Sequence, residues 1–159
     1  MKEIKTTAQV LVDCLEAEGV DVMFGIPGEE TLDLMFAIRD SKIRFIPVRH
    51  EQGAAFMADV YGRLTGRAGV CLSTLGPGAT NLVTGVADAY LDGAPLVAIT
   101  GQVGTDRMQL TSHQYLDLTA MFELHKRDTF SLRCSFLFLY PEGSPQDSTS
   151  NLTYSHGRC

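Results

Sequence analysis

The sequence lacks the features of several common classes of protein. No block of Lys or Arg stands out and the net charge is −6, so nothing in the composition supports nucleic-acid binding. No stretch approaches the roughly 20 apolar residues that a membrane-spanning helix needs. The start, MKEIKTTAQV, carries Glu3 and has no apolar signal segment. These absences predict a cytoplasmic protein that contacts neither nucleic acid nor membrane.

The cysteines are too dispersed to form a metal site or a disulfide framework. Cys14, Cys71, Cys134 and Cys159 lie far apart in sequence, and there is no CxxC or Cys/His cluster. Cys14 falls on an apolar helix face and Cys71 in an apolar strand, so both are predicted to be core thiols. We therefore expect no structural metal.

What is present is an alternation of helices and strands in the first 123 residues. Apolar runs are predicted to be strands at 20–24, 43–48, 69–74 and 95–100. The runs are nearly continuous, which is typical of a parallel sheet covered on both faces. Short helix-containing connections between them predict an α/β fold with a doubly wound, mainly parallel sheet.

The helix boundaries are marked by residues with known end preferences. Thr6 and Gln9 predict a capping box at the start of the first helix. Pro27 is expected to open the second helix, with Leu32, Met35 and Phe36 facing inward.

The composition changes near residue 123. Residues 1–123 contain 30 Ala, Val and Ile residues together, whereas residues 124–159 contain none. SFLFLY could form a strand there, but PEGSPQDSTSN has the composition of a linker or disordered segment. We therefore divide the chain into a partial domain at 1–123, incomplete at its C-terminus, and a divergent tail at 124–159. The tail is either poorly ordered or out of frame, and the second reading is favoured.

Three polar, glycine-rich segments follow consecutive predicted strands. They are FGIPGEE, RHEQGAA and STLGPGATN. In an open α/β sheet, ligands bind beyond the carboxyl ends of the strands. Alone, Gly-Pro-Gly before a helix is often only a turn, and Glu51 could simply suit a helix N-terminus; no Walker A or GxGxxG pattern is present. The joint placement of the three segments at one sheet edge predicts a ligand site.

The same segments carry a family resemblance. FGIPGEETLDL, the run from Arg49 to Gln102, and HQYLDLTAMF resemble the N-terminal pyrimidine-binding domain of thiamine-diphosphate enzymes. Acetolactate synthase large subunits are the most similar of these. The resemblance covers about residues 4–123 and then stops, which supports the out-of-frame interpretation of the tail.

The resemblance implies a role for Glu51, the acid of the family's "HE" pair. In the family this glutamate hydrogen-bonds N1′ of the cofactor's aminopyrimidine and relays a proton during activation of thiazolium C2. Gln114 matches a glutamine beside the substrate, although His113 replaces the Phe often found before it. The positions that match cofactor-binding residues, besides Glu51, are Gly25, Pro77, Gly78 and Asn81.

The resemblance also implies a reaction and partners. The family condenses two pyruvates, or pyruvate and 2-oxobutyrate, with decarboxylation, in branched-chain amino-acid biosynthesis or acetoin formation. Its sites lie between two subunits, and some members have a regulatory small subunit. Mg²⁺ and FAD are implied as well, but the domains that bind them are absent from this sequence. We therefore expect the isolated chain to have no turnover.

Other readings remain open. Glyoxylate carboligase, oxalyl-CoA decarboxylase and sulfoacetaldehyde acetyltransferase share this domain, although the first is expected to carry Val at position 51. The chain could instead be a non-catalytic module that docks on a full-length subunit. A flavodoxin-like nucleotide binder is the remaining alternative.

Overall fold

The centre of the protein is a six-stranded mixed sheet. The computed structural model describes residues 4–104, 107–108, 112–123, 128–132 and 136–140. The strands are β1 (Val22–Gly25), β2 (Arg44–Pro47), β3 (Gly69–Ser73), β4 (Leu96–Gly101), β5 (Asp128–Leu132) and β6 (Phe136–Tyr140). The helices are α1 (Thr7–Ala17), the 3-10 helix η1 (Glu29–Thr31), α2 (Leu32–Arg39), α3 (Glu51–Thr65), α4 (Pro77–Asp92) and α5 (Leu118–Glu123).

The strand order creates a switch point between β1 and β3. The order is β2-β1-β3-β4-β6-β5, and β1 to β4 pair in parallel. The chain passes from β1 outward to β2, then crosses back to place β3 on the other side of β1. Connections on the two sides of such a point diverge and leave a crevice at the carboxyl ends of the strands. The mainly parallel, doubly wound sheet predicted from the sequence is confirmed.

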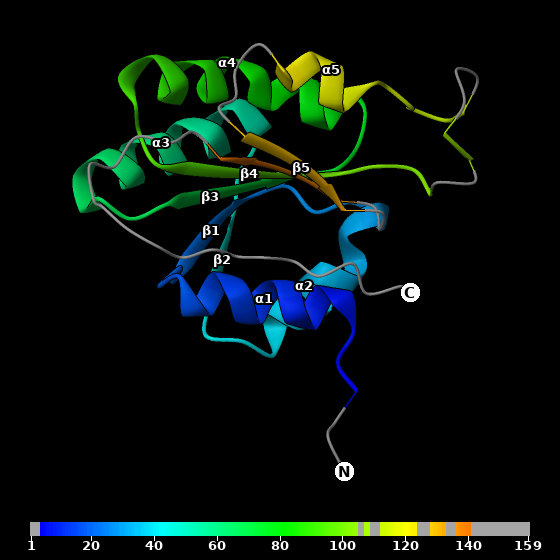
Figure 1. Cartoon of the computed structure of the whole chain (residues 1–159), viewed down its shortest axis with the longest axis horizontal. Helices are drawn as coiled ribbons and strands as arrows, with labels where there is room; N and C mark the ends of the chain where they lie inside the picture. Colours follow the sequence, from blue (N-terminus) through cyan, green and yellow to red (C-terminus); the bar gives the residue numbers. More distant parts are fainter. Residues whose placement is uncertain (1–3, 105–106, 109–111, 124–127, 133–135, 141–159) are drawn as a thin grey trace.

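Helices cover both faces of the sheet (Figure 1), with α1 and α2 on one side and α3, α4 and α5 on the other. Neighbouring residues of a strand alternate between the two cores, since Met23 packs toward α1 and α2 whereas Val22 and Phe24 pack toward α3 and α4. Each central strand therefore needs apolar residues at nearly every position, and all residues of β1 and β3 are buried.

The first helix begins as the sequence predicts. The capping box of α1 is confirmed, because Gln9 N–H donates to Thr6 Oγ1 and Thr6 N–H donates to Gln9 Oε1.

The two cysteines predicted to be core thiols differ in burial. Cys71 is fully buried, and burial raises the pKa of its thiol to about 12. Cys14 is only partly buried. The prediction of a core thiol therefore holds fully for Cys71 alone.

The predicted start of the second helix is wrong, and of its predicted inward residues only Met35 packs, partly buried, against the core. Pro27 precedes η1, and Leu32 and Phe36 are exposed. The buried residues are Thr31, Leu34 and Ile38. Thr31 Oγ1 bonds both the N–H and the carbonyl of Gly28, which creates a tight 3-10 turn before α2. This turn changes the phase of the helix, so the inward row begins at Thr31.

The strands β5 and β6 extend the sheet beyond β4. β6 pairs antiparallel with β4, and β5 pairs antiparallel with β6. β6 coincides with the strand considered possible at SFLFLY. Both strands lie in the segment of changed composition, while residues 124–127, 133–135 and 141–159 lie outside the described ranges. The division of the chain at residue 123 and the origin of its tail stay predictions.

The helices α3 and α4 pack in close contact through small residues. A Cβ built on Gly85 of α4 would lie 2.5 Å from Ala55 Cβ and 3.0 Å from Phe56 N of α3. Both Ala55 and Gly85 are buried. Helix backbones approach this closely only where one side chain is absent, so Gly85 sets the distance between the two helices.

We expect Gly85→Ala to lower the free energy of unfolding by about 1–3 kcal/mol, because the added methyl overfills the helix contact. Gly53→Ala in α3 is the matched control, since a Cβ at Gly53 meets nothing within 4 Å. The control should stabilise the protein by up to about 1 kcal/mol through helix propensity. Urea unfolding of both variants tests this, and equal stability of Gly85→Ala and wild type would contradict it.

Candidate functional site

The candidate site lies at the carboxyl ends of β1, β2 and β3, on both sides of the switch point. The loop from Gly25 to Gly28 follows β1, the turn from Arg49 to Glu51 follows β2, and the turn from Thr74 to Gly78 follows β3. Because the strands are parallel, all three segments emerge at one edge of the sheet. The three glycine-rich segments singled out in the sequence are therefore neighbours in space, as expected.

Glu51 is a buried carboxylate at the first position of α3. Only 8% of the residue is exposed. Its position at the helix N-terminus favours a negative charge, because unpaired backbone N–H groups and the helix dipole are positive there. Its Oε2 accepts a 2.9 Å hydrogen bond from Asn81 Nδ2 of α4. The structure thus joins two of the predicted site residues directly.

Gly78 lies tightly packed between this carboxylate and Thr74, and its missing side chain is what permits the close approach. A Cβ at Gly78 would lie 3.4 Å from Glu51 Oε1 and 2.8 Å from Thr74 Cγ2. Pro77 occupies the first turn of α4, where its missing N–H costs nothing, and its side chain is exposed. Of the predicted residues in this segment, Asn81 bonds Glu51 and Gly78 lies beside it. Pro77 instead occupies the first position of α4.

Gln114 lies against the same turn through its backbone. A Cβ at Gly76 would lie 2.5 Å from Gln114 O and 2.8 Å from Gln114 Cβ. Gln114 has φ +54°, a left-handed conformation that costs a non-glycine residue energy. Its side chain is exposed. The segment that carries Gln114 is therefore held over the turn before α4, which brings this predicted catalytic residue to the site.

Gly25 has a structural reason to be glycine that needs no ligand. Its Cβ would lie 2.3 Å from Leu72 O, so any larger residue would collide with the backbone of β3. This close approach of strands at the switch point explains the glycine by packing alone. The predicted role of Gly25 in cofactor binding stays a prediction.

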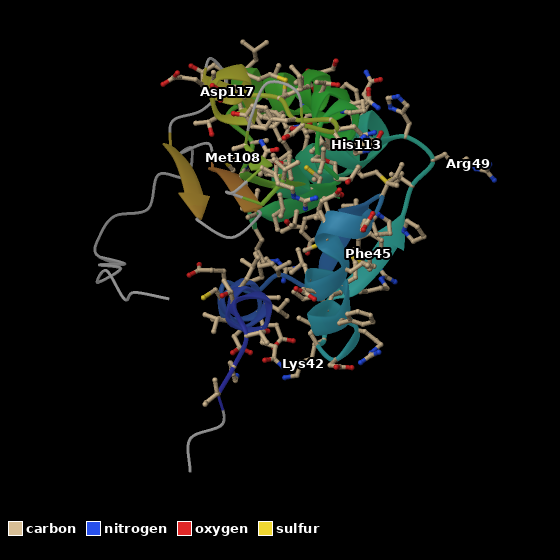
Figure 2. All side chains as sticks on the ribbon, turned by 90° about the vertical axis from the view of Figure 1, so that its right-hand side faces the viewer. Lys42, Phe45, Arg49, Met108, His113 and Asp117 are labelled. Carbon is tan, nitrogen blue, oxygen red and sulfur yellow. The ribbon has the colours of Figure 1, made fainter. Side chains whose placement is uncertain are left out.

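Arg49 and His50, which precede Glu51, are both exposed. Figure 2 shows Arg49 pointing away from the body of the protein. His50 is the N-cap of α3, and its Nδ1 accepts a 3.2 Å bond from Gln52 N–H. Of the three ionisable residues in this turn, Glu51 alone is buried, because the capping geometry turns its side chain toward α4.

A second carboxylate at the same edge was not singled out as a site residue. Glu30 is partly buried, and its Oε2 accepts a 2.7 Å bond from Thr74 Oγ1. In the sequence Glu30 is the last residue of FGIPGEE, where an acid also suits the N-terminus of the helix that follows. The signal that could have found the pair is that Glu30 and Thr74 each follow one of the strands that flank the switch point.

The residues present fit the aminopyrimidine of thiamine diphosphate. A ring nitrogen of that kind needs one carboxyl group at hydrogen-bond distance in a dry pocket, together with room for a flat ring. Glu51 offers the buried carboxyl group, Asn81 holds its Oε2, and Gly78, having no side chain, lets the backbone of α4 come close to its Oε1. The donor set therefore suits this half of the cofactor.

The described ranges include neither a cluster of metal ligands nor a membrane-spanning helix. Among the side chains described, no three His, Cys, Asp or Glu residues come close enough to bind a metal ion. None of the described helices combines the length and apolar character needed to cross a bilayer.

Comparison with known proteins agrees with this geometry. Residues 5–121 match the family described as "Thiamine pyrophosphate enzyme, N-terminal TPP binding domain". The chain belongs to this family. The match covers every strand of the parallel part of the sheet and all the candidate site residues.

Relatives of this thiamine pyrophosphate domain are named acetolactate synthase. The chain is 45% identical over 126 residues to the probable acetolactate synthase large subunit of Methanocaldococcus jannaschii, covering 79% of this chain and 21% of the relative. It is 51% identical over 116 residues to the catabolic acetolactate synthase of Raoultella terrigena, covering 72% and 21%. It is 47% identical over 125 residues to the chloroplastic acetolactate synthase of Arabidopsis thaliana, covering 69% and 19%.

The chain thus spans about a fifth of the length of the curated relatives that it matches. The resemblance to acetolactate synthases inferred from the motifs is confirmed. The roles of Glu51, Gln114, Gly25, Pro77, Gly78 and Asn81 are not tested by these comparisons and stay predictions.

The contact between Glu51 and Asn81 makes a pH-dependent prediction for this thiamine pyrophosphate domain. Asn81→Asp would place a second carboxylate 2.9 Å from Glu51 Oε2, and the two negative charges would repel. The repulsion needs a negative charge on both carboxyl groups, so it is largest at neutral pH and fades as acid neutralises one of them. We expect a loss of about 1–3 kcal/mol at pH 7.5 that shrinks toward pH 4.5.

Urea unfolding at the two pH values measures this loss. Thr84→Asp is the matched control, because it adds the same charge at an exposed position of the same helix. A loss of equal size in both variants, or one independent of pH, would show that Glu51 and Asn81 do not interact as described.

Proposed function

We propose that this chain supplies the aminopyrimidine-binding half of a thiamine diphosphate site in an acetolactate synthase-like enzyme. The observation that carries the proposal is the buried carboxylate of Glu51, held by Asn81 and bordered by Gly78. The family match and the acetolactate synthase relatives support the same assignment.

Each residue has a distinct part in the proposed site. Glu51 holds a proton at a ring nitrogen of the pyrimidine, and the buried position of the carboxyl group keeps water from competing for that bond. Asn81 fixes the orientation of the carboxyl group. Gln114, whose backbone lies against Gly76, is the residue proposed to contact the substrate. When bound, thiamine diphosphate supplies the electron sink for decarboxylation.

The proposed reaction is that of the whole enzyme. Pyruvate is the donor, and a second pyruvate or 2-oxobutyrate is the acceptor, in branched-chain amino-acid biosynthesis. Since the chain spans about a fifth of its relatives, we propose that further protein segments bind the diphosphate and that this chain alone has no turnover. Mg²⁺, FAD, a regulatory small subunit and a cytoplasmic location stay predictions from the resemblance. Another thiamine-diphosphate decarboxylase or carboligase remains the alternative.

Glu51→Gln tests the proposed site. In a ¹⁵N NMR titration of the full chain with thiamine diphosphate, we expect the amide signals of Glu51, Gly78 and Asn81 to shift in the wild type. We expect Glu51→Gln to weaken binding about 10- to 100-fold, because hydrogen bonds to a charged group contribute about 1.5–3 kcal/mol. NMR is chosen because it detects millimolar affinity.

Glu18→Gln is the matched control for this titration. It makes the same charge change at the exposed C-cap of α1, on the other side of the sheet, and should bind like the wild type. Unchanged spectra on addition of thiamine diphosphate, or equal binding by Glu51→Gln and wild type, would reject the proposed site.

The outer face of α3 and α4 supports the proposal that the enzyme is a homodimer or a higher oligomer. Met57, Val60 and Leu64 form an exposed apolar row on α3, and Leu64 is 81% exposed. Leu91 of α4 is 80% exposed. The ion pair between Arg63 Nη1 and Asp92 Oδ2, at 2.5 Å, holds these helix ends together. Exposed apolar groups gathered in this way favour burial against a second protein surface.

We expect the double variant Leu64→Glu, Leu91→Glu to lower the mass measured by light scattering to that of a single chain. The matched control is Leu32→Glu, Phe36→Glu on the opposite layer, where two exposed apolar residues receive the same charges. The control should keep the wild-type mass. A wild-type chain that is already a monomer, or dissociation by the control alone, would contradict the assignment of this face.

A further inference from the structure

Glu30 and Thr74 meet across the switch point although 44 residues separate them. Glu30 lies in η1 after β1, and Thr74 lies directly after β3. Thr74 Oγ1 donates a 2.7 Å bond to Glu30 Oε2, and both residues are partly buried. A hydroxyl that donates to a carboxylate forms one of the stronger hydrogen bonds in proteins. The bond therefore holds the Thr74 side chain in one rotamer.

That rotamer places the methyl group of Thr74 against Gly78, in the first turn of α4. Thr74 Cγ2 lies 2.8 Å from the position that a Cβ on Gly78 would take, and Glu51 Oε1 lies 3.4 Å from the same position. A threonine side chain has few rotamers, and each sends its methyl group in a different direction. The hydrogen bond to Glu30 thus selects the rotamer in which the methyl group of Thr74 packs against Gly78.

Two glycines leave room for the pair. A Cβ on Gly28 would lie 2.4 Å from Thr74 Oγ1, and a Cβ on Gly101 would lie 3.2 Å from Glu30 Cβ. A side chain at Gly28 would occupy the place of the hydroxyl and prevent the bond. Packing around Glu30 and Thr74 therefore accounts for these two glycines.

We propose that Glu30 and Thr74 are positioning residues that hold the first turn of α4, and with it Gly78, at a fixed place beside Glu51. The two residues act through Gly78 and need not touch a ligand. The inference rests on the proposed function, because its consequence for binding assumes that thiamine diphosphate binds at Glu51. The hydrogen bond, and not the negative charge, is the feature that matters.

Three variants separate the hydrogen bond from the charge. Thr74→Val keeps the shape and removes the donor, and Glu30→Leu removes the acceptor. Glu30→Gln removes the charge but keeps an acceptor oxygen. In the NMR titration with thiamine diphosphate, we expect Thr74→Val and Glu30→Leu each to weaken binding about three- to tenfold. Glu30→Gln should stay within about twofold of the wild type and so rescue the loss.

A second readout needs no ligand. The N–H of Thr80 donates to Gly76 O at 3.0 Å, in the first turn of α4. Its hydrogen exchange should speed up severalfold in Thr74→Val and Glu30→Leu but not in Glu30→Gln. Exchange in the core strand β3 is the control for global stability and should stay unchanged in all three variants.

The outcomes distinguish the two proposals. If the wild type binds no thiamine diphosphate, the proposed function fails, and the exchange at Thr80 still decides whether the pair holds the turn. If Glu30→Gln behaves like Glu30→Leu, the charge is what matters and the positioning role is overturned. Unchanged exchange and affinity in Thr74→Val would overturn it as well.

Discussion

The buried carboxylate of Glu51 is the constraint around which the candidate site is organised. A carboxylate that is only 8% exposed needs hydrogen-bond partners and a favourable potential. The N-terminus of α3 gives the potential, and Asn81 of α4 gives the partner at 2.9 Å. The bond from Asn81 depends on the close packing of the two helices, which Gly85 permits. The geometry of the site is therefore a consequence of the helix contact.

The glycines of the three site segments have different physical reasons. Gly25 and Gly28 avoid collisions with Leu72 and Thr74 and serve the packing of β1 against β3. Gly76 has φ +56° and starts the turn before α4. Gly78 alone borders Glu51. Glycines in one such segment can therefore serve the packing of the fold or border the candidate site. Only the neighbours of each glycine in the structure show which of the two applies.

The two helical layers differ in character. The layer of α3 and α4 carries the site at the first turns of its helices and exposed leucines near their last turns. It also buries Asp59, whose pKa is raised by burial although Arg63 donates to its Oδ2. The layer of α1 and α2 has neither a buried carboxylate nor a candidate ligand residue among its described side chains. Glu51 of the candidate site and the exposed leucines proposed for association therefore both belong to the layer of α3 and α4.

The sequence by itself determined the fold class, because continuous apolar runs separated by amphipathic helices fit only a covered parallel sheet. It also determined the Thr6–Gln9 cap, which depends on neighbours in the chain, and the family, which long motifs carry. Only the tertiary structure decided which face of α2 is buried, because the turn held by Thr31 shifts the helix phase. The hydrogen bond between Thr74 and Glu30 likewise could not be predicted from the sequence. Strand order, which brings residues 44 positions apart to one edge, is a property of the whole sheet and leaves no local pattern in the chain.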